Sequence, residues 1–421
     1  MGVAPLKIFL RPEKRFVSEA RPTELLVLAR IVPAEIPVPP TRRLGIVVDR
    51  TIASDASLLA ELGRAVRRGC EHLEPNDVLT IVTAGESADR ILAPTRVRDL
   101  PDIESLLTAV TASGGPVTYT AWLAAGVELA EDWDRDAVNR VIVVTRSVGE
   151  GPTPESASVV RAARGLFRRG ISTSTIGIGL DFDEDLLVPL AVEGGGNAWF
   201  AERPDELAAI FDAEVRSLGA VYTEWATLRF DMVGADVVDV LNDLPWVAEN
   251  KIALPPLVAE SAFHVVARLR LRPGDAGHDM SPLTLRIKNL DLPCRNATVH
   301  RKAMKVHVVS SALADSMEPD IAVQAHAARL QLARSHARCI THLDKDEAPA
   351  ARELLDFALS RFQSLSGQSG STLLTRDLAT LMRARERILD PSSRKLVRKL
   401  FRYAAVGALR SDLIGGQGFA G

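Results

Sequence analysis

Between residues 44 and 179, short apolar runs alternate with longer segments whose apolar residues recur at helical spacing. Strands that are apolar along their whole length are buried on both faces, which requires helices on both sides of a mostly parallel sheet. The runs lie at 44–49, 77–85, 138–145 and 171–179, and the helical segments at 58–73, 103–110, 122–133 and 156–170. We therefore predict an α/β domain with a doubly wound, mostly parallel sheet, closed by a helix over 204–218.

The pattern changes on both sides of this domain. Residues 219–310 contain alternating apolar and polar runs without a helical period, which predicts antiparallel strands. Two earlier strands, at 5–10 and 24–32, have no other partners, so we expect them to pair with the later ones. The sequence thus predicts a β-sandwich formed by residues 1–41 and 219–310, into which the α/β domain of residues 42–218 is inserted.

The C-terminal quarter follows a helical period again. From about residue 317 onward, four amphipathic segments follow one another along the chain. The short loop DKDEAP joins the first two, and a short loop makes neighbouring helices antiparallel. We predict an α-helical C-terminal domain over 311–412. The glycine-rich end, 413–421, is expected to be a flexible tail.

Composition narrows the classes of function. The chain is 47% hydrophobic and 25% charged with a formal net charge of −3, which is ordinary for a globular protein and argues against a nucleic acid as partner. The cysteines, Cys70, Cys294 and Cys339, lie far apart and indicate neither a disulfide framework nor a zinc site. No stretch approaches the ~18 apolar residues of a membrane span. We expect a cytoplasmic protein that does not span a membrane.

Motifs of catalysis are missing from the sequence. There is no GxSxG elbow, no phosphate-binding GxxxxGK[ST] loop and no pair of histidines spaced to share one face of a helix. The acidic cluster at 181–185 lacks the spacing of a calcium loop and is typical of a helix N-terminus. We therefore expect a protein that is not an enzyme.

Several separated segments point to a known family. They are the apolar strand that ends in Asp49, the segment GGPVTYTAW at 114–122, the strand VIVVT that ends in Thr145, and STSTIGIGLDFDEDLL followed by GGGNAWFAE. In this order they resemble bacterial von Willebrand factor A domain proteins, whose domain is often flanked by a β-domain of the inter-α-trypsin-inhibitor heavy-chain kind. The resemblance covers roughly residues 5–310 and implies a domain that binds protein partners.

In that family the functional element is a metal-ion-dependent adhesion site. An Asp-x-Ser-x-Ser loop, a threonine and a later aspartate hold one Mg²⁺, which keeps a coordination position open for a carboxylate of the partner. Here the loop retains Asp49 and Thr51, but Ala53 has no oxygen to offer, and Ser54 reaches the metal only through a local shift. The resemblance therefore implies a degenerate site.

The two remaining positions also depart from the family pattern. The threonine of the second loop is either Thr118 or Thr120, and the sequence does not choose between them. Arg146 stands where the family has an aspartate, and a guanidinium is a cation without a lone pair to give. We expect no metal cofactor. If Mg²⁺ does bind, its ligands are Asp49, Thr51 and Thr118.

One hypothesis gives Arg146 the place of the metal, paired with Asp49 and offering its remaining donors to a partner carboxylate. The alternatives are a purely structural ion pair and a side chain extended into solvent. We predict a non-enzymatic scaffold or adaptor in a multiprotein assembly, and the alternative is a Mg²⁺-dependent adhesion-type receptor for an acidic residue. The predicted partner-binding residues are Asp49, Thr51, Ser54, Thr118, Thr120 and Arg146.

Overall fold

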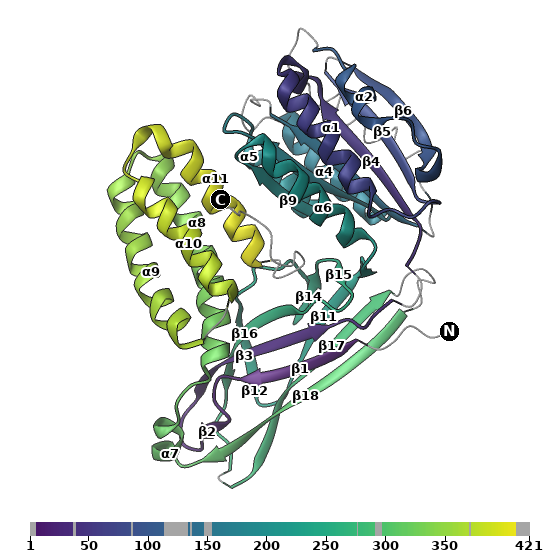
Figure 1. The fold of residues 1–421 in the computed structure, drawn as a ribbon. Coiled ribbons are helices and arrows are strands. Elements are labelled where there is room, and N and C mark those ends of the chain that lie inside the picture. The colour runs from purple at the N-terminus through teal and green to yellow at the C-terminus, as the bar shows by residue number, and fades with distance from the viewer. Residues whose placement is uncertain are drawn as a thin grey trace. The chain divides into compact units, whose positions relative to one another are not determined.

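The computed structural model describes residues 6–36, 39–85, 87–112, 134, 137–146, 154–275, 277–290, 297–369 and 372–409. The chain forms two compact units (Figure 1). Pro37–Glu224 makes the α/β unit, and Met1–Ile36 with Trp225–Asp291 and Arg295–Leu413 makes the β/helical unit. The exact boundaries of the sandwich and helical domains stay predictions.

A six-stranded sheet is the centre of the α/β unit. Its strand order is β6-β5-β4-β7-β8-β9, and only the edge strand β6 runs antiparallel to its neighbour. The strands β4, β7 and β8 are buried along almost their whole length, as expected for strands covered on both faces. The bounds are β4 (Arg42–Asp49), β5 (Val78–Ala84), β6 (Ala88–Arg96), β7 (Val138–Thr145), β8 (Ile171–Ile178) and β9 (Gly195–Ala201).

Helices cover both faces of this sheet, which confirms the doubly wound α/β fold (Figure 1). On one face α1 packs against α2 and α6, and on the other α4 packs against α5. The expected helix over 122–133 lies outside the described residues. The bounds are α1 (Ala56–Cys70), α2 (Ile103–Thr108), α4 (Pro154–Arg168), α5 (Glu184–Glu193) and α6 (Leu207–Leu218), with short 3-10 turns at η1 (Arg50–Ser54), η2 (Val97–Asp99) and η3 (Pro204–Glu206).

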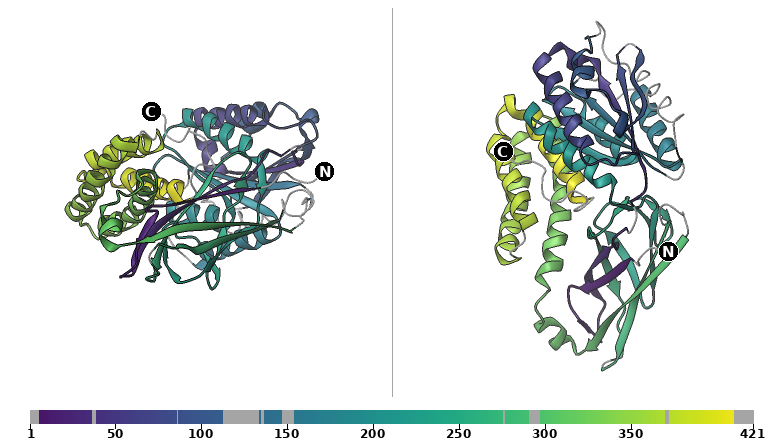
Figure 2. Two further views of the ribbon diagram at one scale, coloured as in Figure 1. Left: turned by 90° about the horizontal axis from the view of Figure 1, so that it is seen from below. Right: turned by 45° about the vertical axis from the view of Figure 1, so that its right-hand side comes forward.

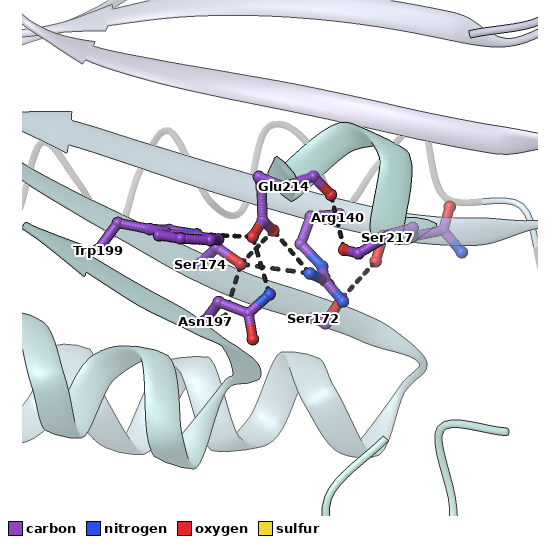
Figure 3. A network of polar contacts seen from close by, with 8 residues as sticks. Arg140, Ser172, Ser174, Asn197, Trp199, Glu214 and Ser217 are labelled. Carbon is purple, nitrogen blue, oxygen red and sulfur yellow. Dashed lines mark hydrogen bonds and ion pairs between the residues drawn. The ribbon is translucent and has the colours of Figure 1, made fainter. Parts of the chain in front are cut away.

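A buried polar network ties α6 to the sheet (Figure 3). Glu214 has no exposed surface, and its Oε1 accepts hydrogen bonds from Arg140 Nη1 and the Ser174 hydroxyl, both at 2.6 Å. Its Oε2 accepts from Asn197 Nδ2 at 2.8 Å and from Trp199 Nε1 at 2.7 Å. Burial alone raises the pKa of Glu214, but the Arg140 charge and the donated hydrogen bonds together hold that pKa below its usual value.

The β/helical unit contains two sheets, in which the N-terminal strands lie beside strands from the later segment (Figure 2). One sheet has the order β1-β3-β16-β12, and the other has the order β13-β14-β11-β17-β18-β2. Of the two predicted N-terminal strands, β3 pairs with β16 of the later segment as expected, whereas β1 is an edge strand that pairs with β3. The bounds are β1 (Lys7–Pro12), β2 (Phe16–Ser18), β3 (Thr23–Val32), β11 (Ala226–Met232), β12 (Ala235–Val240), β13 (Trp246–Ala248), β14 (Lys251–Leu254), β16 (Phe263–Leu271), β17 (Asp279–Leu290) and β18 (Ala297–Val309).

Some short elements escape prediction from the sequence. The strands β2, β13 and β14 have three or four residues. Two further strands are as short: β10 (Val221–Thr223) has three residues and β15 (Leu257–Val258) has two. Alternation of apolar and polar residues becomes readable only over about 4–8 residues. Prolines at 245, 255 and 256 further break the pattern around these strands.

The C-terminal helices confirm the predicted helical region, and α8 packs onto the four-stranded sheet. Val323, Ala327 and Leu330 of α8 form an apolar cluster with Leu28 and Val266 of that sheet. No helix in the described part of the chain is long and apolar enough to cross a membrane. The bounds are α7 (Ser311–Ser316), α8 (Ile321–Asp344), α9 (Ala348–Ser369), α10 (Thr372–Arg387) and α11 (Arg394–Leu409), with a 3-10 turn at η4 (Pro391–Ser393).

We predict that Arg140→Met lowers the free energy of unfolding by about 3–5 kcal/mol, because it leaves the Glu214 carboxylate buried without its counter-charge. The matched control is Arg164→Met. Arg164 forms an ion pair with Glu193 at 2.7 Å on the surface, so its loss is expected to cost at most about 1 kcal/mol. Urea unfolding measures both variants, and equal costs would contradict the account of the network.

Candidate functional site

The strand order of the α/β unit reverses beside β4. The chain passes from β4 to β5 on one side, whereas β7 pairs with β4 on the other. In open α/β sheets the crevice outside the carboxyl ends of the strands, at such a switch point, is where ligands bind. Asp49 is the last residue of β4 and Thr145 the last residue of β7, so both lie at this position.

Asp49 is fully buried at the switch point, and both of its carboxylate oxygens accept hydrogen bonds. Oδ1 accepts from the backbone N–H of Thr51 at 2.8 Å, which caps the short turn η1. Oδ2 accepts from the hydroxyl of Thr145 on the neighbouring strand. A buried carboxylate is costly unless donors meet it, so these two bonds account for its place in the core.

Thr51 and Ser54 lie in the first loop after Asp49, and their hydroxyl groups differ in hydrogen bonding. Thr51 Oγ1 is buried, and it has no hydrogen-bond partner among the described residues. The hydroxyl of Ser54 donates to the backbone carbonyl oxygen of Thr51 at 2.7 Å. The predicted local shift that would turn Ser54 toward a metal is therefore not the conformation of this loop.

Arg146 forms its ion pair with Asp55, and the hypothesis that it pairs with Asp49 is corrected. Its Nη1 lies 3.5 Å from Asp55 Oδ2, and the two side chains are 38% and 45% exposed. Asp55 also caps α1 by accepting from the backbone N–H groups of Ser57 and Leu58, each at 3.1 Å. The physical reason is placement: Arg146 follows the strand end and reaches the helix cap at the surface, whereas Asp49 is buried.

A second arginine at the strand tips was missed by the sequence analysis. Arg50 follows Asp49 directly, and its Nη2 lies 2.6 Å from Asp89 Oδ2 while its Nε donates to the Thr83 hydroxyl at 3.1 Å. Its position just past the end of a buried strand was the available signal. In the Asp-x-Ser-x-Ser motif Arg50 occupies the first x position, so the motif itself assigns no role to it.

We call the residues gathered here the strand-tip cluster: Asp49, Arg50, Thr51, Ser54, Asp55, Asp89, Thr145 and Arg146. Thr118 and Thr120 lie outside the described residues. Across the part of the chain that the structure describes, no three histidine, cysteine or acidic side chains come together as a metal site. Asp183 caps α5 by accepting from the backbone N–H of Asp185 at 2.8 Å, as expected for the acidic cluster at 181–185.

Comparison with protein-family models and with curated protein sequences finds no match. Among solved structures, a von Willebrand factor type A protein from Catenulispora acidiphila is similar, with a TM-score of 0.66 and 15% identity over 94% of this chain and 96% of that one. The ArnB paralog VWA2 from Sulfolobus acidocaldarius has a TM-score of 0.61 and 14% identity over 97% and 100%. Human COPII-coat protein Sec24c has a TM-score of 0.53 and 9% identity over 92% and 60%.

At these identities the similarity establishes the fold, which is von Willebrand factor A-like in the α/β unit. The first two similarities extend over nearly the whole of both chains, so they include the β-strands and the C-terminal helices as well. The kind of β-domain that flanks the α/β unit, and the loss of the metal site, stay predictions.

We predict that Thr145→Val costs more stability than Thr175→Val. The Thr145 hydroxyl donates to a buried carboxylate, a bond worth about 1.5–3 kcal/mol, whereas the buried Thr175 hydroxyl donates to the backbone carbonyl of Leu187 at 3.0 Å, worth about 0.5–1.5 kcal/mol. Thermal and urea unfolding of the two isosteric variants measure the difference. A larger cost for Thr175→Val would show that the bond to Asp49 is unimportant.

Proposed function

We propose that this chain is a non-enzymatic, protein-binding adaptor, and that its partner contacts the strand-tip cluster of the α/β unit. The von Willebrand factor A-like fold supports an interaction domain in general terms. The location of the cluster at the switch point supports this end of the sheet as the contact surface.

The observation that carries the proposal is a pair of arginines on either side of the buried Asp49. Arg146 is 38% exposed and Arg50 is 24% exposed, and each is held by a carboxylate that is itself about half exposed. A guanidinium has five N–H donors, so one ion pair leaves donors for a second carboxylate. The cluster therefore suits an acidic side chain of a protein partner.

The donors among the described residues do not suit a resident Mg²⁺ ion, and Thr118 and Thr120 lie outside these residues. Mg²⁺ requires near-octahedral oxygen ligands, but Asp49 already accepts bonds on both oxygens, Ala53 offers no oxygen and Arg146 adds a positive charge. Of the described motif positions, Thr51 keeps a hydroxyl oxygen without a hydrogen-bond partner among the described residues. We infer that recognition proceeds without the metal.

The chemistry of the cluster also supports a binding role. Its members are two arginines, three aspartates and three hydroxyl residues, without a histidine, cysteine or lysine to act as a base near pH 7. Within the described cluster, the threonine and serine hydroxyls therefore have no histidine, cysteine or lysine beside them to act as the activating base. For that reason we propose no reaction at this site.

The second candidate function is a Mg²⁺-dependent adhesion-type receptor, and one observation favours it. Thr51 Oγ1 is a buried oxygen that has no hydrogen-bond partner among the described residues. Buried polar atoms are normally paired, so a metal ion would supply the interaction that this oxygen lacks. That reading requires Asp49 to exchange the hydrogen bond from Thr145 for a bond to the ion. It predicts a partner that is lost when divalent metal is removed.

The two candidates separate in a pull-down of the tagged full chain from its native lysate, run in parallel with Mg²⁺ and with EDTA and analysed by mass spectrometry. We expect the same partner under both conditions, and its loss from the Arg146→Glu variant, which removes the exposed donors and adds a repelling charge.

The matched control is Arg164→Glu, a charge reversal at an arginine of α4 that is 50% exposed and lies outside the cluster. It should recover the partner as the unaltered chain does. Loss of the partner in EDTA would favour the metal-dependent receptor, and retention by Arg146→Glu would remove the strand-tip cluster from the interface.

A further inference from the structure

The outward face of the six-stranded sheet in the β/helical unit is strongly basic. Leu228, Ile252 and Ile287 are buried on the inner face, so the residues next to them along β11, β14 and β17 point outward. These outward neighbours are mostly arginine and lysine. The same alternation continues on β18, where Met304, Val306 and Val308 are buried and the residues between them are exposed.

Four cations lie in one row across four adjacent strands of this sheet. Arg229 is paired in register with Lys251 on one side and with Arg286 on the other, and Arg286 is paired in turn with Arg301. Neighbouring strands are about 4.8 Å apart, so these charges are close together. Like charges directly opposite each other on a sheet destabilise it, so the row is an electrostatic cost to the fold.

One carboxylate compensates only the middle of the row. Asp231 lies 3.1 Å from Arg229 Nε and accepts two hydrogen bonds from Arg286, one of them at 2.7 Å. Lys251 and Arg301, at the ends of the row, have no ion pair among the described residues. Lys288 and Lys305, on the same face of β17 and β18, are exposed and likewise unpaired within the described ranges.

The other sheet of the same unit shows the arrangement that stability alone favours. There Asp236, Arg270 and Glu24 stand in register across β12, β16 and β3, so that charges alternate along the row. Arg270 Nη2 lies 2.9 Å from Glu24 Oε1. The row of like charges on the six-stranded sheet therefore does not reflect an excess of cations in the chain, whose formal net charge is −3.

We propose that this cationic face binds an acidic segment of a protein partner. The face consists of Arg229, Lys251, Arg286, Lys288, Arg301 and Lys305. Its arginines hold carboxylates through paired N–H donors, and a row of cations across four strands suits carboxylates that recur along an extended or helical segment. This surface is independent of the strand-tip cluster, because it lies in the other unit of the chain.

The surroundings of the row favour carboxylates over nucleic acid. The outward neighbours in the adjoining rows are Thr227, Ala253, Thr284, Val299 and Ala303, which have no rings, and the rings further along, His307 of β18 and Phe16 of β2, lie against each other with centroids 5.5 Å apart. The net negative charge of the whole chain also opposes a long polyanion, whereas a short acidic segment meets only the basic face.

The test uses the full chain and a fluorescent synthetic peptide that carries a glutamate on every helical turn, read by fluorescence anisotropy. We expect saturable binding that weakens as salt is raised, and no binding of the matched peptide with glutamines. The double variant Lys288→Glu/Arg301→Glu should weaken binding about tenfold or more, since it replaces attraction by repulsion.

Stability distinguishes this role from a structural one. Lys288→Glu/Arg301→Glu puts a carboxylate beside Arg286, so its melting temperature should equal or exceed that of the unaltered chain. The control Arg270→Glu breaks the alternating row of the other sheet and should lower the melting temperature while peptide binding is unchanged.

Four outcomes would overturn the proposal: no binding of the glutamate peptide, equal binding by the double variant, tighter binding of an oligothymidine or of phosphatidylserine vesicles than of the peptide, or a dimer of the chain that the double variant abolishes. The strand-tip substitutions leave this face unchanged, so failure here is distinguishable from failure of the proposed function.

Discussion

The fold of the α/β unit depends on how a charge is kept inside it. Asp49 ends the central strand with no exposed surface, and a carboxylate in that position requires donors on both oxygens. The turn after the strand supplies one through the Thr51 backbone, and Thr145 supplies the other from the next strand. The Thr145 bond joins β4 to β7 where the strand order reverses, and the Thr51 bond fixes the turn that carries Thr51 and Ser54, so Asp49 links the sheet to the first loop of the strand-tip cluster.

The arginines of this chain differ in how many carboxylates they meet and in how deeply they are buried. At the strand tips Arg50 and Arg146 are each held by one exposed carboxylate, which leaves donors for a partner. On the cationic face, four charges stand in register with only Asp231 among them. By contrast Arg140 is enclosed with Glu214, where the pair serves stability. The same residue type therefore has different consequences according to burial and to the number of carboxylates that it meets.

The sequence predicted the architecture because long apolar strands and amphipathic helices have readable periods. It also placed Asp49, Thr51 and Arg146 near one another, since the ends of neighbouring parallel strands meet at one edge. It did not predict the partner of Arg146, because a helix cap such as Asp55 competes for a side chain only once the helix is in place. Nor did it find Glu214 and Arg140, which are 74 residues apart and meet only through the packing of α6.

The central claim is that the strand-tip cluster works without a metal, and calorimetric titration of Mg²⁺ tests it most directly. The unaltered chain is compared with the variant Ala53→Ser/Arg146→Asp, which restores an oxygen at two positions of the motif. Our account predicts heat of binding from the variant and none from the unaltered chain. Binding of Mg²⁺ by the unaltered chain as tightly as by the variant would contradict it.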